Sequence, residues 1–226
     1  MITGMNFLLG FLMSTSIASG VPVSTPTTLV AATTSSSIVH NASLPMDAST
    51  TVPDVPFYSQ FRNIQAAGWQ KLGCGVASLA MIIDFYRPRA VSVNALLQEG
   101  IAEGAYSKGA GWKHEGLVLL AREYGLKGED YDLSHLEIAA AFAQFEKFLK
   151  EGPVMASVYY KFDPKSPIPH LVVINGIEGG RIYYNDPAGI AGGQEISIAD
   201  FMKGWKRKFI VIQPQEEARL AKQIFG

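Results

Sequence analysis

Cysteine is almost absent from this sequence, because the chain of 226 residues contains only one, Cys74. A disulfide within the chain is therefore excluded, and so is a zinc site built on several thiolates. A lone cysteine is usually a small buried hydrophobe. Its alternatives are a thiol that pairs with another chain and a thiol kept free for chemistry. The residues around Cys74 decide between these interpretations.

An excess of charge of either sign is also missing, since the formal net charge is -1. A nucleic-acid partner would require a clustered basic surface, so we expect none. The longest basic cluster, Lys206 to Lys208, lies between Trp205 and an apolar run. We interpret it as a solvated turn or the start of a strand.

The N-terminal segment lacks charged side chains entirely, with no Asp, Glu, Lys or Arg from Met1 to Met46. Its apolar run, residues 6–13, is shorter than the about 20 residues of a membrane span and fits the core of a signal peptide. We expect a signal peptide-like segment at 1–20, cut after Gly20 or after Ala32, and a flexible Ser/Thr/Pro-rich linker at 21–52. The chain would then be extracytoplasmic with no stable membrane span. No Lys or Arg precedes the apolar run, so a retained anchor stays an alternative.

The remaining residues show helical periodicity first and strand patterns later, which indicates an α+β fold. A glycine-rich stretch, 104–111, lacks the Gly-Lys-Ser/Thr ending of a phosphate loop, and we interpret it as a mobile surface loop. A capping box of Ser134 and Glu137 predicts where the last long helix starts. The expected helices are 75–86, 93–103, 112–124, 134–151 and 200–205, and the expected strands are 154–160, 170–176, 181–185, 194–198 and 208–213. We expect the folded domain at 53–213 and a helical tail at 214–226.

Cys74 lies between Gly73 and Gly75, directly before the most hydrophobic helix. The unpaired amides of a helix N-terminus stabilise a thiolate, which is the reactive form of cysteine. The two glycines would leave the thiol uncrowded. A purely structural cysteine would be expected inside the apolar stripe of the helix, so this position favours a nucleophile.

A nucleophilic thiol requires a base, and the chain has four histidines. His40 falls in the linker, while His114 and His135 lie among charged residues near helices, where we expect them to be solvated. His170 begins the apolar strand 170–176 and is the candidate that can face a cleft.

An acceptor that orients the histidine is suggested by a hairpin. Glu178-Gly179-Gly180 predicts a tight turn between two strands, which would bring residues 185–188 back beside 170–173. Asp186 would then lie near His170. As an isolated motif, Asp186-Pro187 is an ordinary turn start.

These motifs together resemble the bacteriocin-processing (double-glycine leader) peptidase family of the papain-like cysteine peptidase superfamily. The resemblance covers roughly residues 53–213, and no transporter segment accompanies it. The matching segments are Val55 to Gln60, Gly73 to Met81, Gly152 to Val154, Pro169 to Gly176 and Asn185 to Pro187, with Phe201 and Trp205 in a late helix.

The resemblance implies a papain-like domain in which N-terminal helices, with the nucleophile at a helix N-terminus, pack on a C-terminal antiparallel β-sheet. It assigns Cys74 as nucleophile, His170 as general base and acid, Asp186 as orienting residue and Gln60 as oxyanion donor, with no cofactor or metal. Gln70 is the rival donor, because the stretch between Gln60 and Cys74 is longer than usual in such enzymes. The implied function is cysteine peptidase activity on a peptide or protein substrate. The alternatives are an acyltransferase or amidase on the same fold and a surface binding module without activity.

Overall fold

The structure is a computed structural model, and it describes residues 52–215. The expected signal peptide-like segment and all of the expected linker except Val52 lie outside the described residues. Of the expected helical tail, only Pro214 and Gln215 are described, and Pro214 belongs to the last strand.

Six antiparallel strands form one sheet in the order β3-β8-β4-β5-β6-β7. The last strand of the chain, β8, lies between β3 and β4, whereas β4 to β7 neighbour one another in chain order. Of these six strands, β3 is the one that precedes the last long helix. The bounds are β3 Leu126–Asp132, β4 Val154–Tyr159, β5 Pro169–Glu178, β6 Arg181–Asn185, β7 Gln194–Ser197 and β8 Trp205–Pro214. A separate two-stranded hairpin pairs β1 Tyr106–Ser107 with β2 Gly111–Trp112.

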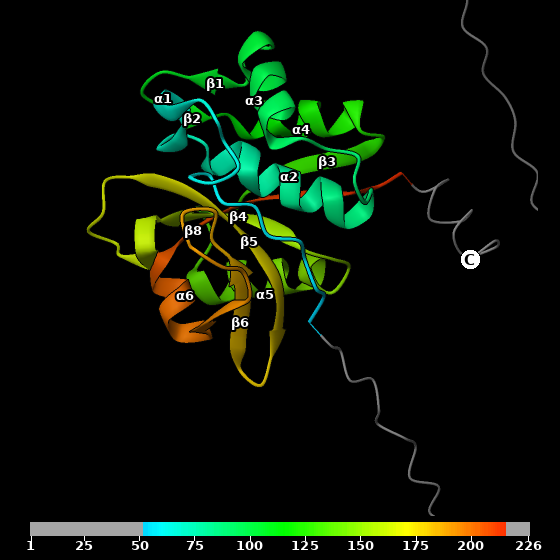
Figure 1. The fold of residues 1–226 in the computed structure, drawn as a ribbon. Coiled ribbons are helices and arrows are strands. Elements are labelled where there is room, and N and C mark those ends of the chain that lie inside the picture. The colour runs from blue at the N-terminus through cyan, green and yellow to red at the C-terminus, as the bar shows by residue number, and fades with distance from the viewer. Residues whose placement is uncertain (1–51, 216–226) are drawn as a thin grey trace, which may run out of the picture. The chain divides into compact units, whose positions relative to one another are not determined.

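The helices cover both faces of this sheet (Figure 1). The earlier helices α2, α3 and α4 pack on one face, and the later helices α5 and α6 pack on the other. The bounds are α1 Ala67–Gln70, α2 Cys74–Tyr86, α3 Val93–Ala102, α4 His114–Glu123, α5 Ile138–Leu149 and α6 Ile198–Gly204. A single 3₁₀ turn, η1 Tyr160–Phe162, follows β4.

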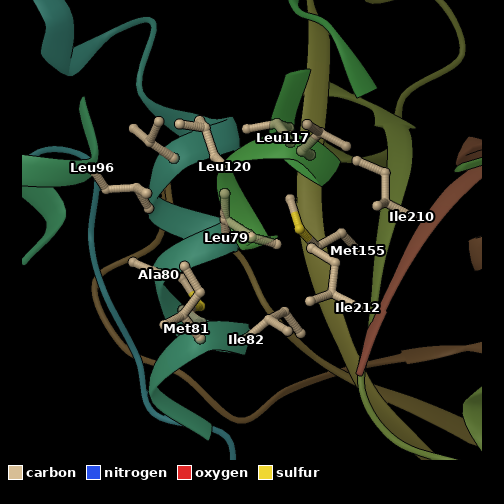
Figure 2. Packing of buried hydrophobic residues seen from close by; sticks show 14 of the residues in the cluster. Leu79, Ala80, Met81, Ile82, Leu96, Leu117, Leu120, Met155, Ile210 and Ile212 are labelled. Carbon is tan, nitrogen blue, oxygen red and sulfur yellow. The ribbon is translucent and has the colours of Figure 1, made fainter. Parts of the chain in front are cut away.

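Helix α2 is buried along nearly all of its length, because it lies between the sheet and two other helices. Figure 2 shows Leu79 and Ile82 of α2 beside Met155 and Ile212 of the sheet. The opposite side of the helix meets Leu96, Leu117 and Leu120 of α3 and α4. A helix enclosed in this way must be apolar all round, which explains its sequence.

The central strands are buried on both faces, so alternate residues enter two different clusters. Met155 and Ile210 face α2, whereas Ala156 and Phe209 face α5 and α6. This explains why β4, β5 and β8 read as continuous apolar runs. The predicted α+β arrangement, helices first and packed on an antiparallel sheet, is thereby confirmed.

Two expectations about individual elements were wrong, and one strand was not predicted. Strand β3 was missed because its sequence is polar, yet all seven of its residues pair with β8 at the edge of the sheet. Part of the stretch 104–111 is the β1-β2 hairpin, with Gly109 and Gly111 at positive φ. Helix α5 starts at Ile138 without a side-chain cap, because the Ser134 amide donates to Asp132 in a turn instead.

Within residues 52–215, no helix has both the length and the apolar character needed to cross a bilayer.

Candidate active site

Cys74 is the first residue of α2, and its side chain is partly exposed while the helix behind it is buried. The amides of the first turn of a helix have no partner within the helix, so they point toward the region of the thiol. One turn further along, the Ser78 hydroxyl donates to the carbonyl of Leu171 at 3.2 Å. This bond fixes the start of α2 against β5 next to His170.

The glycines that flank Cys74 have a packing role that the sequence did not suggest. A Cβ on Gly75 would lie 2.5 Å from Cγ of Trp112, and one on Gly73 would overlap the side chain of Ile64. Trp112 is itself held in place, because its Nε1 donates to the carbonyl of Leu72 at 2.6 Å. The glycines therefore allow neighbouring side chains to pack closely around Gly73 to Gly75, the segment that contains the predicted nucleophile and is called the nucleophile loop below.

His170 is buried near the start of β5, and its Nε2 lies 2.6 Å from Oδ1 of Asp186. The β5-β6 hairpin brings the two together, with Val173 opposite Asn185 and a bulge between Ile174 and Gly176. Oδ1 of Asp186 also accepts from the amide of Ala188 at 2.8 Å, which holds the carboxylate in a turn.

The charge of His170 follows from two opposing effects. Burial lowers the pKa of His170, but hydrogen bonds and charges from Asp186 and Cys74 outweigh it and raise that pKa from 6.5 to about 9. Nε2 of His170 is used by Asp186, so Nδ1 is the ring nitrogen left for the thiol of Cys74.

Gln60 lies behind the nucleophile loop, in contact distance of Gly73, and its side chain is buried. Its Nε2 donates to the backbone carbonyl of Gln70 at 2.8 Å. An amide nitrogen carries two hydrogens, so one remains for another acceptor. The side chain of Gln70 instead donates to the carbonyl of Ile64 at 3.0 Å. Each of the two rival glutamines keeps one amide hydrogen, and what separates them is that the buried Gln60 side chain lies against Gly73.

The segment that carries Gln60 is tied to the loop that carries Asp186. The amide of Gln60 donates to the carbonyl of Pro187 at 2.8 Å. Upstream, buried Asn185 donates to the carbonyl of Val55 at 2.9 Å and accepts from the amide of Gly193 at 2.8 Å. One buried asparagine therefore positions both the lead-in segment and the loop of the orienting carboxylate.

Cys74 and His170 line one cleft of about 530 Å³. His114 also lines it, and its Nε2 lies 2.8 Å from the hydroxyl of Ser157. The expectation that His114 is solvated was therefore wrong, because the β1-β2 hairpin turns the start of α4 toward the sheet. His135 is exposed, as expected. Of the four predicted site residues, Cys74 and His170 line this cleft, whereas Gln60 and Asp186 do not. The other lining residues are Lys71, Leu72, Tyr106, Gly109, Ala110, Gly111, Trp112, His114, Ser157, Ile168, Pro169, Leu171, Lys206 and Lys208.

These additional lining residues carried little signal in the sequence. Each strand of the β1-β2 hairpin is two residues long, so neither shows a period. Ser157 lies inside an apolar strand, where a serine is easily taken for an ordinary buried residue without a functional role.

Among residues 52–215, no three His, Cys, Asp or Glu side chains are grouped as metal ligands would be.

Comparison with known proteins places this geometry in a family. Residues 52–212 match the model of the Peptidase_C39 like family. Among curated proteins, no significant match to the sequence was found.

Several solved structures are similar in fold. A putative C39-like peptidase from Bacillus anthracis is 20% identical with a TM-score of 0.54, over 72% of this chain and 96% of the other. A double glycine motif protease from an AMS/PCAT transporter, crystallised with the leader peptide, is 26% identical with a TM-score of 0.49, over 72% and 93%. The peptidase domain of Streptococcus ComA is 19% identical with a TM-score of 0.47, over 64% and 93%.

The first of these structures shares the papain-like α+β fold described above. The family model spans most of the chain and includes Gln60, Cys74, His170 and Asp186. The chain therefore belongs to the Peptidase_C39 like family.

Proposed function

We propose that this protein is a cysteine peptidase that hydrolyses peptide bonds through a thioester acyl-enzyme. The observation that carries the proposal is the position of His170, whose imidazole is hydrogen-bonded to Asp186 and lines the same cleft as the Cys74 thiol. A thiol, a base and an acceptor that orients the base are the parts that nucleophilic acyl transfer requires.

In the proposed reaction, the Cys74 thiolate attacks the carbonyl carbon of the scissile bond, and the carbonyl oxygen takes the negative charge. The imidazolium of His170 then gives its proton to the departing amine as the carbon–nitrogen bond breaks, which leaves a thioester. Neutral His170 takes a proton from water, and the resulting hydroxide attacks the thioester. The carboxylic acid leaves and the thiolate–imidazolium pair is restored.

Two donors are available for the oxyanion. The first is the backbone amide of Cys74 at the start of α2, where helix amides are unpaired. The second is the remaining Nε2 hydrogen of Gln60, whose side chain lies against Gly73. Donors of this kind act by stabilising charge that develops only in the transition state.

Incubation of the purified chain with a mixed peptide library tests this proposal. New peptide termini should appear with the wild type and be absent with Cys74→Ala, whose thermal unfolding should match the wild type. Free carboxylates at the new C-termini indicate hydrolysis. Transfer of the acyl group to an added amine in preference to water would instead identify an acyltransferase. Equal cleavage by wild type and Cys74→Ala would contradict the proposal.

A further inference from the structure

One end of the cleft is basic. Lys206 and Lys208 line it together with His114 and with Ser157, which pairs with Lys208, whereas the exposed Lys71 lines the cleft next to Leu72. None of the described residues that line the cleft is Asp or Glu. The interpretation of Lys206 to Lys208 as a merely solvated strand start is thus incomplete. The three residues do belong to β8, but two of their side chains reach the same cleft as Cys74.

A bulge in β8 gives this end its shape. Ser157 of β4 pairs with Lys208, whereas the next residue, Val158, pairs with Trp205, so two residues of β8 are left over. Arg207 lies between the lysines with φ of 58° and sends its side chain away, to the carbonyl of Leu136. Bulges of this kind commonly occur beside active sites, where they redirect side chains.

Lys206 has no carboxylate partner among residues 52–215. Its half-buried ammonium lies 4.8 Å from the ring centre of Tyr159. Burial lowers the pKa of Lys206, and the charge of Lys208 lowers it further. A partly desolvated cation that faces a like charge would be stabilised by an anion in the cleft.

The other polar groups at this end are already partnered. Lys208 is 2.8 Å from the carboxylate of Asp132. His114 contacts Ser157, and burial lowers the pKa of His114 although Asp130 and Asp132 act in the opposite direction. A neutral His114 supplies hydrogen-bonding capacity and no charge, so Lys206 is the group that requires a counter-charge.

Other residues that line the cleft are apolar. Leu72 is 41% exposed and Ile168 is 52% exposed, and both stand at the cleft beside Tyr106. Apolar residues of this kind suit the aliphatic and backbone atoms of a bound peptide. The basic end and the apolar residues together describe a site for a peptide with an anionic group at one end.

We propose that Lys206 and the neighbouring polar groups bind a carboxylate of the peptide substrate close to the scissile bond. This inference rests on the proposed peptidase function and narrows its substrate class to peptides with an acidic side chain or a free C-terminal carboxylate there. Ser157 and His114 would complete the subsite by hydrogen bonding.

Matched peptide pairs test the subsite. Variants of a peptide that the protein cleaves are made with Glu or Gln at each position flanking the scissile bond. Each variant is prepared with a free and with an amidated C-terminus, and the values of kcat/KM are compared. We expect the carboxylate form to be preferred about tenfold in kcat/KM, which corresponds to about 1.4 kcal/mol. Lys206→Gln should remove the preference, and Lys206→Glu should reverse it toward Lys-containing peptides. Lys147→Gln, the same charge change on exposed α5, should preserve it.

The two sources of the carboxylate give different results. A preference that survives C-terminal amidation identifies an acidic side chain, whereas one that amidation removes identifies the C-terminal carboxylate. Cleavage without any preference in the wild type would overturn the subsite and leave the peptidase proposal standing. An unchanged preference in Lys206→Gln would overturn it as well.

A binding measurement separates the subsite from catalysis. Fluorescence anisotropy with the Cys74→Ala variant should show tighter binding of Glu-containing than Gln-containing labelled peptides, and Lys206→Gln in that background should equalise them. Discrimination without any turnover by the wild type would support the subsite and contradict the peptidase. Equal binding of both peptides together with no turnover would overturn both proposals.

Discussion

The protonation of His170 sets the pH range of the proposed chemistry. Its pKa is raised from 6.5 to about 9, so the imidazolium that must protonate the departing amine persists through neutral pH. We expect kcat/KM to fall as the pH rises through about 9. Asp186→Asn removes a nearby negative charge and should move this decline downward by about one pH unit or more. A pH–rate profile of both proteins checks this, and coincident alkaline limbs would contradict it.

The same shift predicts a pH-dependent contribution to stability. Because the folded pKa of His170 lies above the ordinary value of 6.5, its stabilising contribution is complete below that value. It is lost as the pH rises through about 9. The thermal unfolding temperature of the wild type should therefore fall more over this pH window than that of Asp186→Asn. Equal dependence of the unfolding temperature on pH in both proteins would show that His170 and Asp186 are not coupled.

The oxyanion role can be assigned by comparing two glutamines. The buried side chain of Gln60 lies against Gly73, whereas the side chain of Gln70 donates to the carbonyl of Ile64. Loss of one oxyanion donor typically lowers turnover by about 10²–10³-fold while substrate binding survives. Gln60→Ala should therefore lose kcat by that order with KM little changed, and Gln70→Ala should remain near wild type. Steady-state kinetics that show the reverse pattern would transfer the role to Gln70.

At the scale of single residues, the sequence predicted the position of a site residue where that residue lies at the end of a helix or strand with a clear apolar pattern. Cys74 precedes an apolar helix, and the Gly179-Gly180 turn specifies a hairpin that joins the strands of His170 and Asp186. His114 was misjudged because it follows a hairpin too short to show a pattern. Its neighbours in sequence are charged, and only the fold turns it toward Ser157.

At the scale of elements, the contact between α2 and the β1-β2 hairpin shapes the nucleophile loop. A Cβ on Gly75 would lie within 2.8 Å of three atoms of the Trp112 side chain. Gly75→Ala should therefore destabilise the protein by about 1–3 kcal/mol, as overpacking of a tight site does. It should also reduce activity, because Trp112 lines the cleft.

Gly68 provides the matched control for this prediction. It lies in the short helix α1, and a Cβ there would meet nothing within 4 Å. Gly68→Ala should leave the free energy of unfolding unchanged or raise it slightly, since alanine favours helix more than glycine does. Chemical denaturation of both variants checks the pair, and equal effects would contradict the role of Trp112.

Elements were predictable from the sequence where burial imposed a clear pattern. The helix at 75–86 and the strands of the central sheet are apolar because both of their sides are covered. Strand β3 has one buried residue in seven, so its polar sequence hides a strand that exists through pairing with β8. The start of α5 was misplaced because a capping-box sequence also fits the turn that Asp132 stabilises.

At the scale of the whole molecule, export stays a prediction from the sequence. The segment from Met1 to Met46 has no charged side chain and contains a short apolar run followed by small residues. We propose that this segment directs export and is removed. Mass spectrometry of the protein recovered outside the producing cells should give an N-terminus after Gly20 or Ala32, and recovery of an intact form inside cells alone would contradict export.

The fold brings three distant segments together around the segment Gly73 to Gly75. Helix α2 delivers Cys74, the β5-β6 hairpin delivers His170 with Asp186, and Asn185 holds the lead-in segment that ends at Gln60. Sequence patterns could predict these segments separately, but the cleft also depends on packing between the α2–α4 layer and the sheet. The basic end of the cleft could not be predicted from a sequence pattern, because it arises from a bulge in β8.

The most direct test of the account is the rate at which iodoacetamide alkylates the folded protein, followed by intact mass. The chain has a single cysteine, so every adduct reports on Cys74. We predict rapid labelling of the native wild type at pH 6, where an ordinary thiol is almost wholly protonated. His170→Ala should be labelled far more slowly, because it lacks the imidazolium that stabilises the thiolate. Labelling only after denaturation, or equal rates in both proteins, would contradict the claim that His170 activates Cys74.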